Sequence, residues 1–196
     1  TIEEPPVYAI IILLTENCDS LLPTIRSRCV TLTMNPIEKD KICTYLENKF
    51  QLEPEQAQIA ANYCQGNIGK AIRFASSSDF IEMKNQVLKL LKNLDSMDIA
   101  SIIDTIKEFS THKNDINDYL DLMLLWYRDV LMFKVTKDAN LLLYSDEYSA
   151  ISEQATKRDY ENIENIIAAI DKAKVRLKAN VNFDVTIELM ILAMKD

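Results

Sequence analysis

Residues 120–131 read Leu120-Asp-Leu-Met-Leu-Leu-Trp-Tyr-Arg-Asp-Val-Leu131, and this stretch decides the fold class of the chain. Its apolar side chains recur at intervals of three and four residues, the spacing that places them along one stripe of an α-helix. The pattern predicts a long helix, and the same spacing recurs on both sides of it. We therefore expect a mainly α protein. The longer helices are predicted near residues 97–110, 114–135, 146–154, 157–179 and 183–195.

A group of shorter helices is expected upstream of this bundle. Asn35-Pro-Ile-Glu38 offers an N-cap, a proline at the first helical position and an acid at the third. Pro54 is expected to open the second helix and Asn67 to cap the third, and a fourth completes the group. We therefore predict a small helical domain over residues 35–94 and a helical bundle with short connections over residues 95–196.

The first 34 residues follow a different pattern. Val7-Tyr-Ala-Ile-Ile-Ile-Leu-Leu14 is a continuous aliphatic and β-branched run, typical of a strand buried on both faces of a parallel sheet. Cys29-Val-Thr-Leu-Thr-Met34 predicts a second, shorter strand. Two strands alone do not make a stable parallel sheet. We therefore interpret residues 1–34 as the end of an α/β domain whose main part lies upstream of Thr1.

The composition argues against several classes of function. The chain has 196 residues and only two glycines, Gly66 and Gly69, whereas a phosphate-binding loop needs several closely spaced glycines. A net charge of −8 opposes binding to the phosphate backbone of DNA. One segment is locally basic, and we interpret it as a solvated helix end rather than as a DNA contact. Its basic residues are Lys172, Lys174, Arg176 and Lys178.

Catalytic, metal and membrane features are also lacking in the sequence. The four cysteines have no C-x-x-C spacing and are expected to be free, partly buried thiols in a reducing cytosol. His112 lies in a polar segment between helices and is expected to be exposed. The apolar run of residues 7–14 falls short of the ~20 needed to cross a bilayer. We expect a cytoplasmic protein with no cofactor, no metal and no enzymatic activity of its own. The cysteines are Cys18, Cys29, Cys43 and Cys64.

Two polar motifs follow the predicted first strand. Thr15-Glu-Asn17 stands at its carboxyl end, where α/β sheets bind ligands, although a turn supported by Asn17 and Asp19 explains it equally. Leu21-Leu-Pro-Thr-Ile-Arg-Ser-Arg-Cys29 carries two arginines two residues apart. They are either surface charges or guanidinium groups directed at a partner's phosphate, whose oxygens match the planar fork of arginine.

Preceded by Glu3-Glu-Pro-Pro6, these motifs resemble the end of the ATPase domain in the clamp-loader subunits of the AAA+ family. The resemblance implies that Asn17 occupies the sensor 1 position, in vestigial form. It also implies that Arg28 matches the arginine finger, within an interface formed by Ser27, Arg28 and Cys29. Such a finger reaches into the ATP site of the next subunit and stabilises charge that develops on the γ-phosphate.

A third motif separates the members of this family. In its ATPases, a helix of the lid domain carries the sensor 2 arginine three residues after a glycine. In Cys64-Gln-Gly-Asn-Ile-Gly-Lys-Ala-Ile-Arg73, that position is Gly69. Lys70 and Arg73 are close in sequence, but a shift of one residue turns a side chain by ~100° around a helix. The resemblance is therefore to the non-hydrolysing subunits of the delta-prime type.

Two segments of the predicted bundle extend the resemblance to the collar domain of these subunits. Leu125-Trp-Tyr-Arg-Asp-Val-Leu131 is similar to a W-x-R-D-x-L segment, which places Trp126 and Arg128 among the interface candidates. Asn180-Val-Asn-Phe-Asp-Val-Thr-Ile-Glu-Leu189 is similar to the segment that leads into the last helix. Ordinary structural roles also explain them, namely packing by Trp126, pairing of Arg128 with its neighbour, and an N-cap at Asn182.

The resemblance implies a function and a domain order. Residues 1–34 would end the ATPase-like domain, 35–94 would form the lid, and 95–196 would form the collar that holds a ring of subunits together. The implied partners are the tau/gamma motor and delta subunits of bacterial DNA polymerase III, and the sliding clamp and primed DNA through the assembled complex. Two alternatives stay open: an ATP-hydrolysing subunit of tau/gamma or small replication factor C type, and an unrelated helical adaptor.

Overall fold

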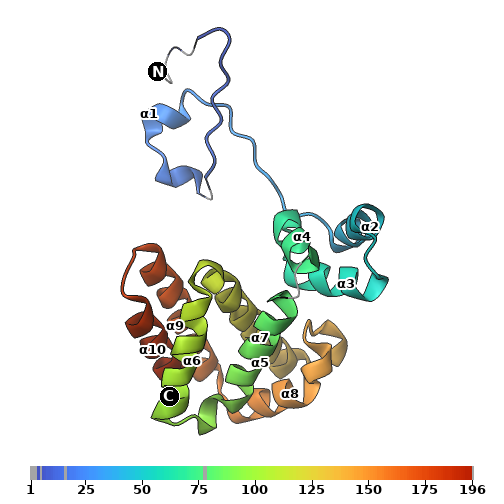
Figure 1. Ribbon diagram of the computed structural model, residues 1–196, viewed down its shortest axis with the longest axis vertical. Helices are drawn as coiled ribbons and strands as arrows, with labels where there is room; N and C mark the ends of the chain where they lie inside the picture. The colour runs from blue at the N-terminus through green and yellow to red at the C-terminus, as the bar shows by residue number, and fades with distance from the viewer. Residues whose placement is uncertain (1–3, 5, 16, 77–78, 196) are drawn as a thin grey trace. The chain divides into compact units, whose positions relative to one another are not determined.

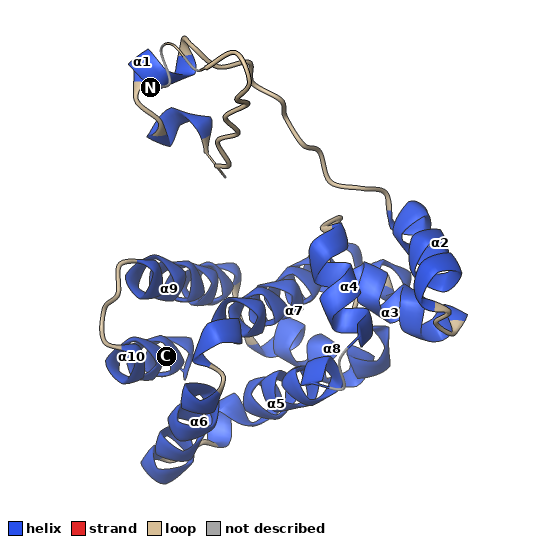
Figure 2. Cartoon of the chain, turned by 45° about the horizontal axis from the view of Figure 1, so that its top comes forward, coloured by secondary structure: helices blue, strands red, loops and turns tan. Residues whose placement is uncertain are grey.

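The computed structural model describes residues 4, 6–15, 17–76 and 79–195, and it divides into two units, Thr1–Pro36 and Ile37–Asp196 (Figure 1). Within the described residues, all regular secondary structure is helical (Figure 2). The predicted mainly α fold is therefore confirmed. No helix among these residues is both long enough and apolar enough to span a lipid bilayer.

The first unit contains two short helical turns, η1 (Cys18–Ser20) and α1 (Pro23–Arg26), joined by irregular backbone. The prediction of strands at residues 7–14 and 29–34 is wrong for this structure, because neither run is paired in a ladder among the described residues. Their side chains face solvent instead. Val7, Ile10, Leu14, Val30 and Met34, for example, are each about nine-tenths exposed or more. Glu3 and Pro5 of the predicted turn lie outside the described residues.

The second unit begins with three short helices, α2 (Lys39–Phe50), α3 (Pro54–Tyr63) and α4 (Ile68–Ser76). The predicted start at Asn35 is wrong: α2 begins at Lys39, because Ile37 donates its backbone N–H to the carbonyl of Gly66 at 2.9 Å and stays extended. The cap at Asn67 is confirmed, since its Oδ1 accepts the N–H of Lys70 at 3.1 Å.

Six further helices follow among the described residues, connected by short turns. They match the predicted helices to within about three residues at each end, which is the usual uncertainty of helix boundaries. The N-cap at Asn182 is also confirmed, because its Oδ1 accepts the N–H of Val185 at 3.0 Å. The helices are α5 (Asp79–Asn93), α6 (Ile99–Thr111), α7 (Ile116–Thr136), α8 (Tyr148–Lys157), α9 (Tyr160–Lys178) and α10 (Phe183–Lys195). The short 3₁₀ turns are η2 (Leu94–Ser96), η3 (Lys113–Asp115), η4 (Ala139–Leu141) and η5 (Ser145–Glu147).

Helix α7 forms the centre of this bundle and packs against α5, α8 and α9 (Figures 1 and 2). Because apolar residues occur on several faces of α7, most of its side chains are buried, including Trp126 and Tyr127 at 0 % exposure. Helix α10 packs against both α9 and α6. Burial of a helix on several sides requires neighbours around it, and the buried carboxylates of α7, Asp118 and Asp129, are each paired with basic side chains.

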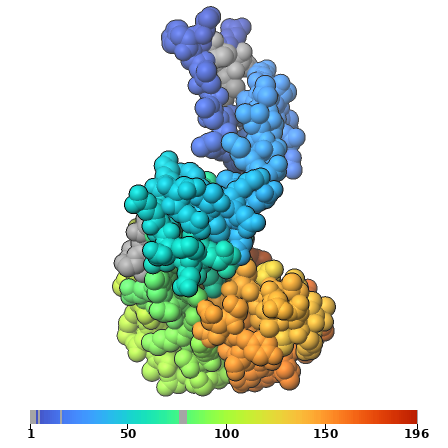
Figure 3. All heavy atoms as spheres, turned by 90° about the vertical axis from the view of Figure 1, so that its right-hand side faces the viewer, coloured from blue at the N-terminus to red at the C-terminus, as the bar shows by residue number. Residues whose placement is uncertain are grey.

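The three short helices lie against the longer ones within the second unit (Figure 3). An aromatic cluster joins them. The ring of Tyr63 at the end of α3 lies 5.0 Å from that of Tyr144, which follows α7, and 5.7 Å from that of Phe80 on α5. Phe74 of α4 stacks on Phe80 at 4.2 Å. These contacts pack α3 and α4 against α5 and the loop that follows α7.

Candidate functional site

The segment around Arg28 is exposed and locally ordered by hydrogen bonds. Arg28 follows α1, and its Nη1 donates to the carbonyl of Thr24 at 2.7 Å. Ser27 also donates its hydroxyl to Thr24, and Ser27, Arg28 and Cys29 are all exposed. Arg26, by contrast, pairs with Asp19 at 2.7 Å. Both arginines of this motif are therefore held by contacts within the first unit.

The Thr-x-Asn motif forms a compact polar turn. Asn17 donates its N–H to the Thr15 hydroxyl at 3.1 Å, and that hydroxyl donates to the Asn17 carbonyl at 2.8 Å. The Oδ1 of Asn17 caps η1 by accepting the N–H of Asp19 at 2.8 Å. In this conformation, the Asn17 side chain supports the turn, which is the structural alternative that the sequence left open.

Gly69 lies in the first turn of α4, close to the capping residue Asn67. A Cβ on Gly69 would come within 3.3 Å of the capping oxygen of Asn67, a tight contact at the helix start. The next basic residues along this helix, Lys70 and Arg73, both turn toward carboxylates of α7. Both side chains are therefore engaged within the chain in this structure.

These contacts form an α4–α7 ion cluster that also includes α9. The Asp118 carboxylate forms ion pairs with Lys70 at 3.0 Å and with Arg73 at 2.7 Å. The Arg73 guanidinium also lies 3.7 Å from the Asp115 carboxylate. Asp121 accepts hydrogen bonds from both Lys70 and Lys174. Sequence reasoning missed these carboxylates, although their i, i+3, i+6 spacing on α7 marks one face of that helix. The cluster consists of Lys70, Arg73, Asp115, Asp118, Asp121 and Lys174.

From the sequence, we interpret the basic segment that includes Lys174 as a solvated helix end. Lys174 differs from that interpretation, because its side chain is bound to Asp121. Lys172 and Lys178 at that end are exposed, whereas Arg176 is half-buried. His112, predicted to be exposed, is also half-buried, with its ring 5.8 Å from that of Tyr119. Both departures have the same cause, because packing between helices covers polar residues at their ends.

The W-x-R-D segment has mainly structural contacts. Trp126 is fully buried, and its indole N–H donates to Gln154 at 3.0 Å. Arg128 is partly exposed and pairs with Asp129 at 2.7 Å. In this chain, Trp126 packs in the core. It would therefore affect an interface only indirectly, by fixing the position of α7. Arg128 presents its side chain to solvent and can reach a partner directly.

Asp129 is the buried centre of this segment. It is 0 % exposed, and its Oδ2 accepts the N–H groups of Leu143 and Tyr144 at 2.7 and 2.8 Å. Burial raises the pKa of Asp129, and these donors together with Arg128 oppose that effect. The carboxylate therefore anchors the loop after α7, which carries the Tyr144 ring of the aromatic cluster.

Replacing Asp129 by alanine is expected to lower the free energy of unfolding by about 3 kcal/mol, because two buried N–H groups lose their acceptor. Asp129→Asn is expected to cost less, since its amide oxygen can accept the same two N–H groups. Urea denaturation followed by circular dichroism measures both changes. Asp104→Ala serves as the matched control, because Asp104 is 76 % exposed. Equal stability of the Asp129→Ala and control variants would contradict the anchoring role.

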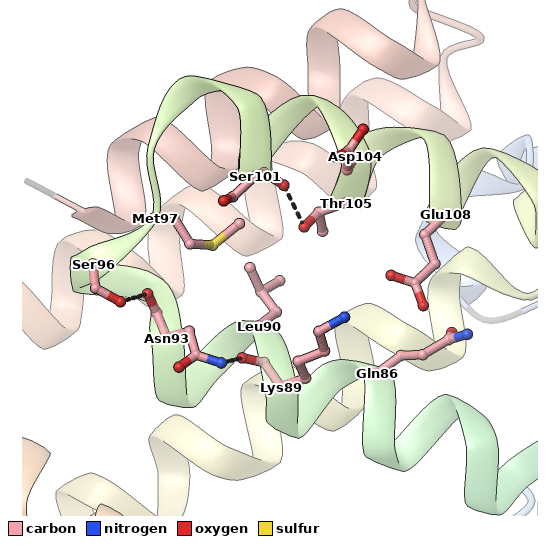
Figure 4. Close-up of a pocket in the computed structure, with 10 residues that line it drawn as sticks. All are labelled: Gln86, Lys89, Leu90, Asn93, Ser96, Met97, Ser101, Asp104, Thr105 and Glu108. Atoms are coloured by element: carbon pink, nitrogen blue, oxygen red, sulfur yellow. Dashed lines mark hydrogen bonds between the residues drawn. The ribbon is translucent and has the colours of Figure 1, made fainter.

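A cavity of about 380 Å³ lies between α5 and α6 (Figure 4). Leu90 and Met97 lie at its base, and the side chains of Lys89 and Glu108 approach each other across its opening (Figure 4). The lining mixes both charges with amides and hydroxyls, so it selects no class of ligand by charge. Among the described residues, no group of histidine, cysteine, aspartate or glutamate is arranged to hold a metal ion.

The cysteines differ in exposure. Cys18 and Cys29 are exposed, whereas Cys43 and Cys64 are buried, and all four are free. Burial raises the pKa of the Cys43 and Cys64 thiols, which keeps them protonated and unreactive.

Helices α6 and α10, which pack against each other, each carry large exposed aliphatic side chains. We call these side chains the α6–α10 face. Large exposed aliphatic groups on adjacent helices are typical of surfaces that bind another protein. The face consists of Ile99 (77 % exposed), Ile103 (46 %), Val185 (48 %), Leu189 (46 %) and Leu192 (42 %).

Comparisons with known proteins agree with these observations. A family described as "DNA polymerase III, delta subunit" matches residues 1–38. The chain is 30% identical to DNA polymerase III subunit delta' of Bacillus subtilis (strain 168), over all of the chain and 59% of that protein. It is 24% identical to subunit tau of the same organism, over 68% of the chain and 28% of tau. It is 20% identical to subunit gamma of Buchnera aphidicola, over 98% of the chain and 59% of gamma. The chain thus spans about three-fifths or less of each relative.

Proposed function

We propose that the chain acts as a non-hydrolysing clamp-loader subunit in DNA replication, because all of it is similar to 59% of the length of a DNA polymerase III delta-prime subunit. One observation supports the proposal that the chain does not hydrolyse ATP. The sensor 2 position is Gly69, and the neighbouring Lys70 and Arg73 are engaged by α7 carboxylates rather than directed to a nucleotide.

Arg28 would supply the arginine finger to the ATP site of a neighbouring subunit. Its exposure and its place after a short helix support this role, because a group that acts in trans must reach beyond its own chain. Ser27 and Cys29 would contribute to the same contact. Asn17 would be a vestigial sensor 1 residue that now caps a turn.

The domain order proposed with this function follows the sequence. Residues 1–34 end an ATPase-like domain, residues 35–94 form the lid, and residues 95–196 form the collar. The collar would hold the chain in a ring with tau/gamma and delta subunits, and its α6–α10 face is the exposed apolar surface suited to that contact. Contact with the sliding clamp and with primed DNA would come through the assembled complex, in the cytoplasm.

The chain is expected to bind no ATP, because its two glycines form no phosphate-binding loop and its sensor 2 position lacks an arginine. Isothermal titration calorimetry of the chain with Mg²⁺-ATP measures this directly. A tau-type motor subunit, titrated under the same conditions, provides the positive control. Binding at micromolar concentration would contradict the prediction.

The alternative is an ATP-hydrolysing subunit, and the similarity to tau and gamma subunits favours it. The sequence upstream of Thr1 in the complete protein discriminates between the two. A G-x-x-x-x-G-K-[ST] motif there would support the motor function, since that loop cradles the phosphates of ATP. A sequence without it would support the non-hydrolysing subunit.

A further inference from the structure

The α4–α7 ion cluster is balanced in charge and partly sheltered from water. It joins three carboxylates of α7 and its preceding turn to three basic groups of α4 and α9. The Asp118 side chain is 7 % exposed, and those of Lys70 and Asp121 are 25 % and 29 % exposed. The Arg73 and Asp115 side chains at its edge are 56 % and 48 % exposed, so dissolved salt reaches the cluster and weakens it.

The contacts within the cluster favour the charged forms of Lys70 and Asp121. Burial acts to lower the pKa of Lys70, but hydrogen bonds to Asp121 and Asp118 outweigh it, and the pKa is raised. Burial acts to raise the pKa of Asp121, but hydrogen bonds from Lys174 and Lys70 outweigh it, and the pKa is lowered. Both shifts keep the pair ionised at neutral pH.

A second contact between the short helices and the bundle has a different character. It consists of the aromatic cluster in which Tyr63 meets Tyr144 and Phe80. Apolar contacts do not weaken when salt screens charge. The helices α2–α4 are thus held by one contact that added salt weakens and by another that it does not.

We propose that Asp118 and Asp121 are positioning residues that hold α4 on α7 as an ionic latch. Through Lys70 and Arg73 they fix the orientation of helices α2–α4 on the bundle. In the ATPases that this chain resembles, the same lid helix carries an arginine for the nucleotide. Here its basic side chains are bound by the collar instead, and the lid orientation is independent of nucleotide. That last consequence rests on the proposed function, whereas the latch itself does not.

Hydrogen–deuterium exchange of the complete chain tests the latch. The test variant is Asp118→Asn with Asp121→Asn, which removes two charges with little change in shape. The control is Asp104→Asn, which removes an exposed carboxylate paired with Lys107 at 3.1 Å. The helices α2–α4 form a unit of about 40 residues, too small to be stable without support, so loosening from the bundle exposes their amides to exchange.

In the double variant, the amides of α2–α4 are expected to exchange about tenfold faster or more, while those of α8 and α10, which contribute no residue to the cluster, keep their protection. The unmodified chain is expected to show the same selective change in about 1 M NaCl, where the Debye length falls to about 3 Å. Asp121→Glu, which keeps the charge, should retain protection. Unchanged exchange in α2–α4, or an equal loss in every helix, would overturn the proposal.

A distance measurement keeps the proposal testable if the double variant is poorly folded. Spin labels at Glu47→Cys on α2 and Lys172→Cys on α9, with Cys18 and Cys29 replaced by serine, report the position of the short helices. In the otherwise unmodified chain, the distance distribution is expected to broaden as salt is raised. A distribution that stays narrow at all salt concentrations would refute the latch. Neither experiment requires partner subunits, so a failed clamp-loader function would leave its outcome unaffected.

Discussion

Replacing Arg28 by alanine is expected to lower the ATP turnover of the reconstituted clamp loader by about 100-fold or more, with assembly of the complex intact. The reason is electrostatic. A guanidinium group that contacts the γ-phosphate stabilises charge that develops only in the transition state, and its loss raises the barrier without affecting how the subunits hold together. The measurement is steady-state ATP hydrolysis stimulated by sliding clamp and primed DNA, with the complete protein that contains this sequence.

Arg26→Ala is the matched control for this experiment. Arg26 lies two residues away in the same motif, but it is committed to Asp19 at 2.7 Å, so its loss should leave turnover within about twofold of the unmodified complex. Arg28→Lys keeps the charge and loses the planar fork, so partial activity is expected. Unchanged turnover in Arg28→Ala would show that the finger assignment is wrong. Equal losses in Arg26→Ala and Arg28→Ala would indicate a disturbed segment rather than a lost finger.

The helices could be predicted closely because their signals are local. Each of these signals depends on residues only a few positions apart in the sequence. Examples are the caps at Asn67 and Asn182, the proline at Pro54 and the three-to-four spacing along α7. The wrong start at Asn35 shows the limit of such signals. The N–H of Ile37 is bonded to Gly66, about thirty residues away, and no property of the capping motif itself encodes that contact.

The two predicted strands failed for a related reason. An unbroken apolar run such as residues 7–14 indicates that its side chains favour burial, but a strand also needs a hydrogen-bonded neighbour. Among the described residues, neither run pairs with another, and both stay exposed. A pattern of hydrophobicity therefore indicates whether a segment favours burial. It does not identify the distant segment that would bury it.

The candidate site was predicted in part. The motifs singled out Gly69, Lys70 and Arg73, but no local pattern joins Lys70 and Arg73 to Asp118 and Asp121, which lie about fifty residues further on. Helical spacing shows that these acids share a face of α7, and only the packing of α4 on the bundle shows what that face meets. Trp126 illustrates the converse case, since a conspicuous residue in a recognised motif is buried in the core.

Placing a charge at each of two positions on the α6–α10 face is expected to weaken incorporation into the clamp-loader ring by about 100-fold or more. The variant is Ile103→Asp with Leu189→Asp. The two side chains are 46 % exposed in the chain alone, so aspartate there is tolerated by the fold and remains hydrated. Burial of the same carboxylates against a neighbouring subunit would leave them desolvated without a partner, which is strongly unfavourable. Gel filtration of the mixed subunits at graded concentrations measures the loss.

Val135→Asp is the control, because Val135 is also an exposed aliphatic residue, at 68 %, but lies at the end of α7 and outside the face. It should enter the ring as the unmodified chain does. Normal assembly of the double variant would show that another surface holds the collar. Loss of assembly in both variants, with helical content preserved, would show that incorporation is sensitive to added charge anywhere on the chain. Loss in the double variant alone assigns the contact to the aliphatic face, independently of any role of Arg28.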